Sequence, residues 1–98
     1  MTMPKFPLGR TLMTQGAQRV VNDPTDPRLT TRLLISLFDR HQAGDWGELD
    51  EEDRHANDCA LKDDGRLLSA YTLPNGVKIW IITEWDRSVT TVLLPDEY

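Results

Sequence analysis

The chain has 98 residues, one cysteine and a net charge of −5, which exclude a second catalytic domain, an internal disulfide and a strong general affinity for nucleic acid. No run of about 18 apolar residues is present to span a bilayer, and the opening MTMPKFPLGRTLM lacks the continuous apolar segment of a secretory signal. A cytoplasmic protein without a membrane partner is therefore expected.

Charge is distributed unevenly along the chain. Residues 1–44 carry a net +3, residues 45–64 carry −7 and residues 65–98 carry −1. Because DNA and RNA repel such an acidic segment, no direct nucleic-acid partner is expected. The segment 45–64 is expected to face either water or a positively charged protein surface.

Residues 1–26 are predicted to form an extended N-terminal region. Within it, residues 7–14 could form one short strand, and the NDPTDP sequence at 22–27 predicts a loop because its prolines disfavour regular structure before them. Asp26 and Pro27 have the form of a helix N-cap and first helical position.

Two helices are predicted over residues 27–64. The first ends near Gly44 and places apolar residues and one histidine on a single side, namely Leu29, Leu33, Leu34, Leu37, Phe38 and His41. The second is predicted to begin at Asp45, with Glu48 at the capping-box spacing three residues later. On this second helix Trp46 is expected on a narrow apolar stripe.

Residues 65–98 change to the alternating pattern of strands and predict an antiparallel β-meander. The dipeptide Asn75-Gly76 predicts a two-residue hairpin turn, which pairs Ala70 with Ile81. A second tight turn, at Asp86-Arg87, pairs Ile81 with Val92. The prediction is thus an α+β fold in one domain, 1–98, with two helices packed on one face of a three- to four-stranded antiparallel sheet.

The outer face of that sheet is expected to be unusually apolar. In the predicted register Tyr71 and Trp80 both lie on it, although a solvated face should be polar. Either the N-terminal region wraps across this face, or the face binds a partner or a second copy of the chain.

The sequence contains no recognised catalytic motif for hydrolysis, phosphate binding or dinucleotide binding. The contiguous run Asp50–Asp53 lacks the alternating pattern of a calcium loop, and His41 and His55 lack partners at zinc spacing. No catalytic, cofactor-binding or metal-binding residue is therefore assigned.

Four segments carry a resemblance to a known group of proteins: residues 8–17 (LGRTLMTQGA), 41–57 (HQAGDWGELDEEDRHAN), 65–71 (GRLLSAY) and 78–98 (KIWIITEWDRSVTTVLLPDEY). They resemble a family of small bacterial proteins carried by plasmids, integrative elements and phages, often labelled plasmid-related or restriction-associated. The resemblance implies a setting in the cytoplasm of a bacterial host and brings no catalytic residues with it.

Three functions follow as expectations. The first is a non-enzymatic protein of a mobile element that binds and inhibits a host DNA-directed defence protein, of anti-CRISPR or anti-restriction type, through an acidic helical surface. The second is a small ribonuclease toxin of the barnase or RelE-like layout, using His41 or His55 with Arg87. The third is a structural or regulatory homodimer that uses the outer sheet face. The expected partner-binding residues are Asp45, Trp46, Glu48, Asp50, Glu51, Glu52, Asp53, Tyr71 and Trp80.

Overall fold

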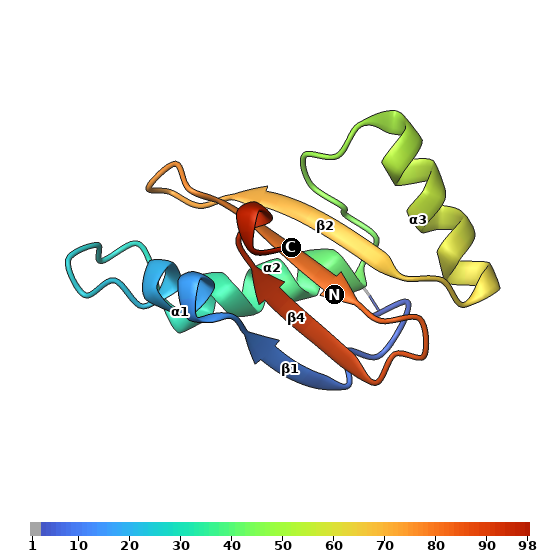
Figure 1. Ribbon diagram of the computed structural model, residues 1–98, viewed down its shortest axis with the longest axis horizontal. Helices are drawn as coiled ribbons and strands as arrows, with labels where there is room; N and C mark the ends of the chain where they lie inside the picture. Colours follow the sequence, from blue (N-terminus) through green and yellow to red (C-terminus); the bar gives the residue numbers. More distant parts are fainter. Residues whose placement is uncertain (1–2) are drawn as a thin grey trace.

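A computed structural model describes residues 3–98 and has the α+β class that the sequence predicts (Figure 1). In chain order its elements are β1 (Arg10–Met13), α1 (Gln15–Val21), α2 (Thr31–Gln42), α3 (Glu51–Asp63), β2 (Leu67–Thr72), β3 (Lys78–Thr83), β4 (Val89–Leu93) and the short 3₁₀ turn η1 (Pro95–Glu97). The described residues thus contain three α-helices, where the sequence predicted two.

The four strands form one mixed sheet in the order β1-β4-β3-β2. The meander β2-β3-β4 is antiparallel, as predicted, and Ile81 pairs with Val92 in the expected register. The prediction of a wholly antiparallel sheet is wrong, because β1 joins the outer side of β4 in parallel, with Arg10 opposite Val89. The long segment between β1 and β4 provides the crossover that a parallel pair needs.

The predicted register between β2 and β3 is wrong by one residue, since Ala70 pairs with Trp80 and not with Ile81. The connecting loop has three residues and not two: Leu73 donates its main-chain N–H to Val77, and Gly76 donates to Leu73. Gly76 adopts the left-handed φ of 86° that such a loop requires. A slip of one residue moves every side chain of β2 to the opposite face of the sheet.

The helices begin later than their sequence patterns predict. Thr30 caps α2 by accepting a hydrogen bond from the Leu33 N–H, and Asp50 caps α3 by accepting one from Asp53. Asp26 instead binds Arg28 within the preceding loop. The N-terminal region is not wholly extended, because Thr14 caps the seven-residue helix α1.

Helices α1 and α2 cover one face of the sheet and enclose the main core. Its buried residues are Ala17, Val21, Leu37, Tyr71, Leu73, Ile79, Ile81 and Val92. The predicted apolar side of α2 supplies Leu37 directly and four further half-buried side chains, Leu33, Leu34, Phe38 and Leu29 just before the helix. Burial of this α2 face against the sheet contributes apolar stabilisation to folding.

A second buried cluster joins the N-terminal segment to the loop before α3. Phe6, Trp46 and Leu67 form it, and the rings of Phe6 and Trp46 stack with centroids 6.3 Å apart. Trp46 reaches this position because Gly47 forms a parallel bridge with Ala70 on the edge of β2 that faces away from β3. A side chain at Gly47 would place its Cβ 2.0 Å from the Ala70 carbonyl oxygen, and φ there is +74°, so glycine is required.

The outer face of the sheet is covered in part by the chain's C-terminus. Tyr98 packs edge-on against Trp80 with ring centroids 5.8 Å apart, and the Arg66 guanidinium lies over the Tyr98 ring. The predicted wrapping of the N-terminal region across this face is wrong, because β1 lies at the sheet edge beside β4 (Figure 1).

Trp46 and Trp85 provide a matched pair for testing the second cluster. Trp46 is 4% exposed and Trp85 is 63% exposed. We expect Trp46→Ala to lower the free energy of unfolding by about 3–5 kcal/mol through the cavity it leaves, and Trp85→Ala to change it by less than about 1 kcal/mol. Urea unfolding measures both, and equal effects of the two substitutions would contradict this placement of Trp46.

Candidate functional site

The candidate site is the acidic helix α3, together with its two cap residues. Residues 50–64 contain seven acidic and two basic side chains, so their net charge equals that of the whole chain. Asn57 is the one buried residue of α3, and every acidic side chain of this segment is exposed. At 100° per residue, Glu51 and Glu52 point away from the side that carries Asn57. The acids of the first turn also interact favourably with the helix dipole.

Four hydrogen bonds, made by Asn57 and Arg87, fix α3 and the turn after it to the body of the protein. The Asn57 side chain donates to the Leu68 carbonyl at 2.6 Å and accepts from the Leu68 N–H at 3.0 Å, as a neighbouring strand would. At the other end of the helix, Arg87 donates to the carbonyls of Ala60 and Gly65. The helix is therefore held in a single position with its acidic side towards solvent.

Sequence reasoning did not identify Asn57 and Arg87 as the residues that position α3. Asparagine inside a helix is a weak helix former, which is a signal for a side-chain role. Arg87 has φ of +62°, unusual outside glycine, and this conformation sits in the turn between β3 and β4. Nothing in the sequence pattern signals this left-handed conformation.

The predicted binding residues in the loop before α3 are already engaged within the chain. Asp45 forms an ion pair with Arg40 at 2.8 Å, and this hydrogen bond holds the pKa of Asp45 below its ordinary value. Glu48 accepts a hydrogen bond from Thr72, and Asp50 caps the helix. Among the acidic residues predicted to bind a partner, those whose carboxylates remain free are in the first turn of α3: Glu51, Glu52 and Asp53.

Trp46 is not available as an anchor for a partner. Its ring is buried in the second cluster, and its indole N–H donates to Asp58 at 3.2 Å. The prediction that Trp46 lies on the stripe of a helix is also wrong, because residues 45–50 form a loop that follows the edge of β2.

Tyr71 and Trp80 do not share a face of the sheet. The shifted register turns Tyr71 into the main core, where its hydroxyl donates to the Asp45 carbonyl at 2.6 Å. Burial raises the pKa of Tyr71 to about 12. Trp80 lies on the outer face beneath Tyr98 and is half-buried. The predicted surface formed by both residues therefore does not exist.

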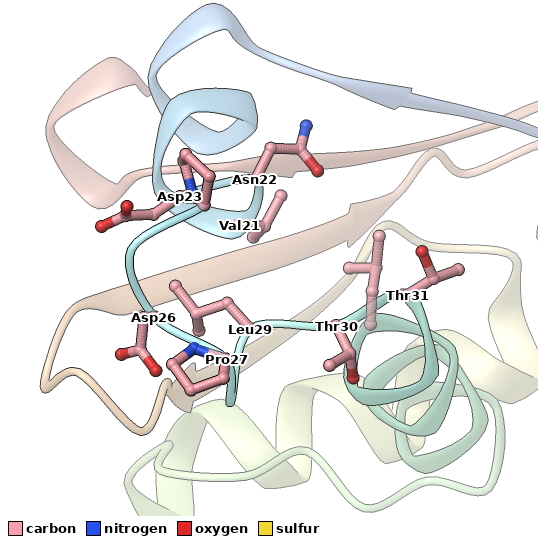
Figure 2. A pocket seen from close by; sticks show the side chains of 10 residues that line it. Val21, Asn22, Asp23, Asp26, Pro27, Leu29, Thr30 and Thr31 are labelled. Atoms are coloured by element: carbon pink, nitrogen blue, oxygen red, sulfur yellow. The ribbon is translucent and has the colours of Figure 1, made fainter.

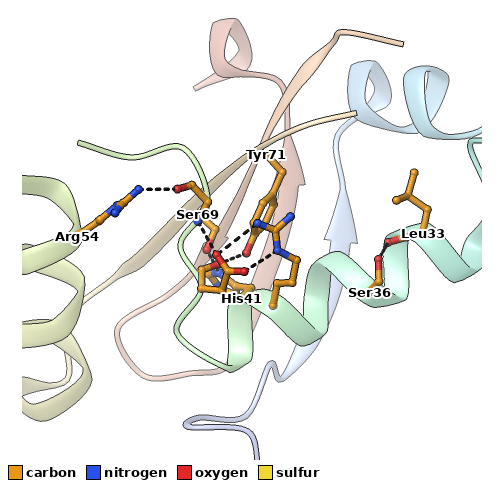
Figure 3. A network of polar contacts seen from close by, with 9 residues as sticks. Leu33, Ser36, His41, Arg54, Ser69 and Tyr71 are labelled. Carbon is orange, nitrogen blue, oxygen red and sulfur yellow. Dashed lines mark hydrogen bonds and ion pairs between the residues drawn. The ribbon is translucent and has the colours of Figure 1, made fainter. Parts of the chain in front are cut away.

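A chain of hydrogen bonds runs through the core from His41. Its Nδ1 lies 2.5 Å from the Ser69 hydroxyl (Figure 3), and its Nε2 lies 2.9 Å from that of Thr83. The Thr83 hydroxyl lies 2.7 Å from the Thr90 hydroxyl, and the Thr90 hydroxyl donates to the Leu8 carbonyl. One set of proton positions satisfies the chain: Ser69 donates to Nδ1, Nε2–H donates to Thr83, and Thr83 donates to Thr90. A neutral imidazole fits these partners without an unpaired group.

The environment of His41 opposes its protonation and its use in catalysis. Burial and, secondarily, the charge of Arg87 lower the pKa of His41 to about 3. Its ring has no exposed surface and packs edge-on against Phe6 and Trp46. A substrate cannot reach this imidazole without opening the core. The other histidine, His55, is exposed and contacts the Cys59 sulfur at 3.6 Å within α3.

A cavity of about 380 Å³ lies between the loop 22–30 and the start of α2 (Figure 2). Asp23 and Asp26 line it, but their carboxylates bind Thr25 and Arg28 within the same loop. Residues 3–98 contain no group of three histidine, cysteine or acidic side chains that could hold a metal ion. The cavity therefore offers no evident chemistry.

No helix within residues 3–98 has both the length and the apolar character needed to cross a membrane. Comparisons of the chain with protein-family models, with curated proteins and with solved structures find no match.

The buried histidine predicts how stability depends on pH. Because the pKa of His41 is lower in the folded state than in the unfolded state, the unfolded chain binds more protons between about pH 3 and 6.5. The free energy of unfolding should fall as pH decreases below 6.5, by up to about 1.4 kcal/mol per pH unit. Urea unfolding at pH 7, 6 and 5 measures this slope.

Two variants separate His41 from other titrating groups. His41→Asn should be less stable at neutral pH, because Ser69 and Thr83 lose a partner, and its stability should vary little between pH 7 and 5. His55→Asn removes the other histidine, at an exposed position of α3, and serves as the control. A slope that survives His41→Asn unchanged would assign the pH dependence to another group.

Proposed function

We propose that the protein is a non-enzymatic accessory protein of a mobile genetic element or phage. In this proposal it acts in the cytoplasm of a bacterial host and inhibits a DNA-directed defence protein, as anti-CRISPR and anti-restriction proteins do. The acidic outer side of α3 binds the positively charged groove of that defence protein. Neither nucleic acid nor a cofactor takes part directly.

The single observation that carries the proposal is the concentration of charge on one anchored helix. The segment 50–64 has a net charge of −5, and α3 buries only Asn57. Residues along a helix rise by about 1.5 Å each, close to the spacing of about 1.7 Å per phosphate charge along duplex DNA. An acidic helix therefore offers a DNA-binding groove a similar linear charge density.

The anchoring of α3 also favours a binding role. A flexible acidic helix would lose conformational entropy on binding, whereas Asn57 and Arg87 have already fixed this one against β2 and the β3-β4 turn. The side chains of Glu51 and Glu52 make no hydrogen bond or ion pair within the described chain, so a partner can pair with them without displacing a contact.

The ribonuclease alternative has no comparable support. An RNA-cleaving site needs an accessible base or acid beside groups that bind phosphate. His41 is fully buried, and Arg87 is occupied by main-chain carbonyls at the end of α3.

The test compares two double charge reversals in DNA-cleavage assays with purified restriction endonucleases and CRISPR surveillance complexes from a bacterial host. Glu51→Lys with Glu52→Lys should abolish inhibition. Asp39→Lys with Asp96→Lys changes the net charge equally at exposed positions away from α3 and should retain it. Raising salt from about 50 to about 300 mM should weaken binding, because screening weakens attraction between exposed charges.

The fold of the reversed variants is checked by circular dichroism and urea unfolding. Loss of two first-turn acids should cost no more than about 2 kcal/mol through the helix dipole. Equal inhibition by both reversals, or inhibition that is insensitive to salt, would show that α3 is only a solvated surface. Failure to inhibit any defence protein would reject the proposed class of partner.

A further inference from the structure

The two edge strands of the sheet, β2 and β1, differ in whether their outward main-chain groups are hydrogen-bonded. On β2, the main-chain groups of Leu68 bind the Asn57 side chain, and those of Ala70 bind the loop 46–48, so this edge is closed. On β1, the N–H of Arg10 and that of Thr14 donate to β4, which fixes the side of the strand that faces its neighbour.

Because successive residues of a strand direct their main-chain groups to opposite sides, Thr11 and Met13 direct theirs away from β4. Within residues 3–98, no hydrogen bond occupies these N–H and C=O groups. Four main-chain groups are thus available along an exposed strand edge, which is the arrangement that pairs readily with another strand.

The side chains along this edge complement an antiparallel copy of themselves. Arg10 lies at the start of β1, Leu12 at its centre, and the Glu97 carboxylate at its end, where it binds the Thr14 hydroxyl. Arg10 forms no ion pair with any described residue. The hydrogen bond from Thr14 lowers the pKa of Glu97, which keeps its carboxylate charged. The order along the edge is therefore positive, apolar, negative.

A second β1 strand that runs antiparallel to the first and is centred on Leu12 provides a partner for each of these main-chain and charged groups. Thr11 lies opposite the second copy's Met13, and such a pair exchanges both main-chain hydrogen bonds, giving four across the interface. Leu12, which is 45% exposed, lies against its own copy. Arg10 of each chain lies opposite Thr14 of the other and so beside Glu97.

The helical side of the edge has room for the second copy. A groove of about 290 Å³ lies there, lined by Thr11, Leu12, Met13, Gln18, Leu34 and Phe38. Met13 faces this side of the sheet, so the second copy's Met13 would lie over the groove.

We propose that the occupant of this edge is a second copy of the chain, and that two copies pair β1 to β1 about a two-fold axis. The two sheets then join into one continuous sheet of eight strands. This surface differs from the outer face around Trp80 and from α3, so the dimer presents two acidic helices to partners.

Sedimentation equilibrium of the full chain over about 1–500 μM tests the proposal. The wild type should be a dimer at the upper end of this range. Thr11→Pro removes one N–H per chain and should raise the dimer dissociation constant about 30-fold, for two lost hydrogen bonds. Thr11→Val keeps the N–H and should leave the dissociation constant unchanged within about threefold.

A charge substitution tests the register. The carboxylate introduced by Arg10→Glu would lie beside Glu97 of the second copy, so this substitution should weaken the dimer at least about tenfold. Arg19→Glu makes the same change of charge on α1 and should have little effect on the dimer. Amide hydrogen exchange of Thr11 and Met13 in the wild type supplies a readout that does not depend on variants. Exchange at both should be slow at high concentration and fast at low concentration.

A wild type that is monomeric throughout the range would overturn the proposal. A dimer in which Thr11 and Met13 exchange as fast as they do at low concentration would also overturn it and would point to the Trp80 face instead. Capture of a foreign peptide at this edge by a chain that does not self-associate would overturn the proposal as well.

Discussion

The hydrogen-bonded chain that runs from Ser69 through His41 to the Leu8 carbonyl is the constraint on which the rest of the structure depends. It joins α2 to β2 and β3 through the two imidazole nitrogens, and it reaches β4 and the N-terminal segment through Thr90. A buried polar network of this kind permits only one register, because a shifted strand would leave hydroxyl groups without partners. It therefore sets which face of β2 is inward, and with it the position of Tyr71.

The position of the acidic helix follows from this register. With β2 fixed, Leu68 and Ala70 present their main-chain groups at the sheet edge, and Asn57 and the loop 46–48 bind them. The same contacts bury Trp46 and turn Glu51 and Glu52 towards solvent. Stability and the candidate site are thus separated: Asn57 and Arg87, which hold α3, are buried and half-buried, while the charged groups on its outer side are exposed and contribute little to folding.

The sequence was sufficient to predict the α+β class, the helix α2 and the β-meander, because their hydrophobic periodicities are strong. It was not sufficient for the details that decide the site. Pro74 allows a three-residue loop around Asn75-Gly76, and the resulting slip moved Tyr71 from the outer face to the core. Asp45 and Asp50 are both of a residue type favoured at helix N-caps, and the choice between them depends on Gly47 meeting β2 far along the chain. Local patterns cannot report such a contact.

Amide hydrogen exchange of the protein alone and with the defence protein proposed as its partner tests the central claim most directly. The account predicts slower exchange in the first two turns of α3, from Glu51 to about Asp58, with little change on the outer face around Trp80. Exchange that slows around Trp80 and Tyr98 while α3 is unaffected would contradict the account, because the partner would then bind the sheet and not the acidic helix.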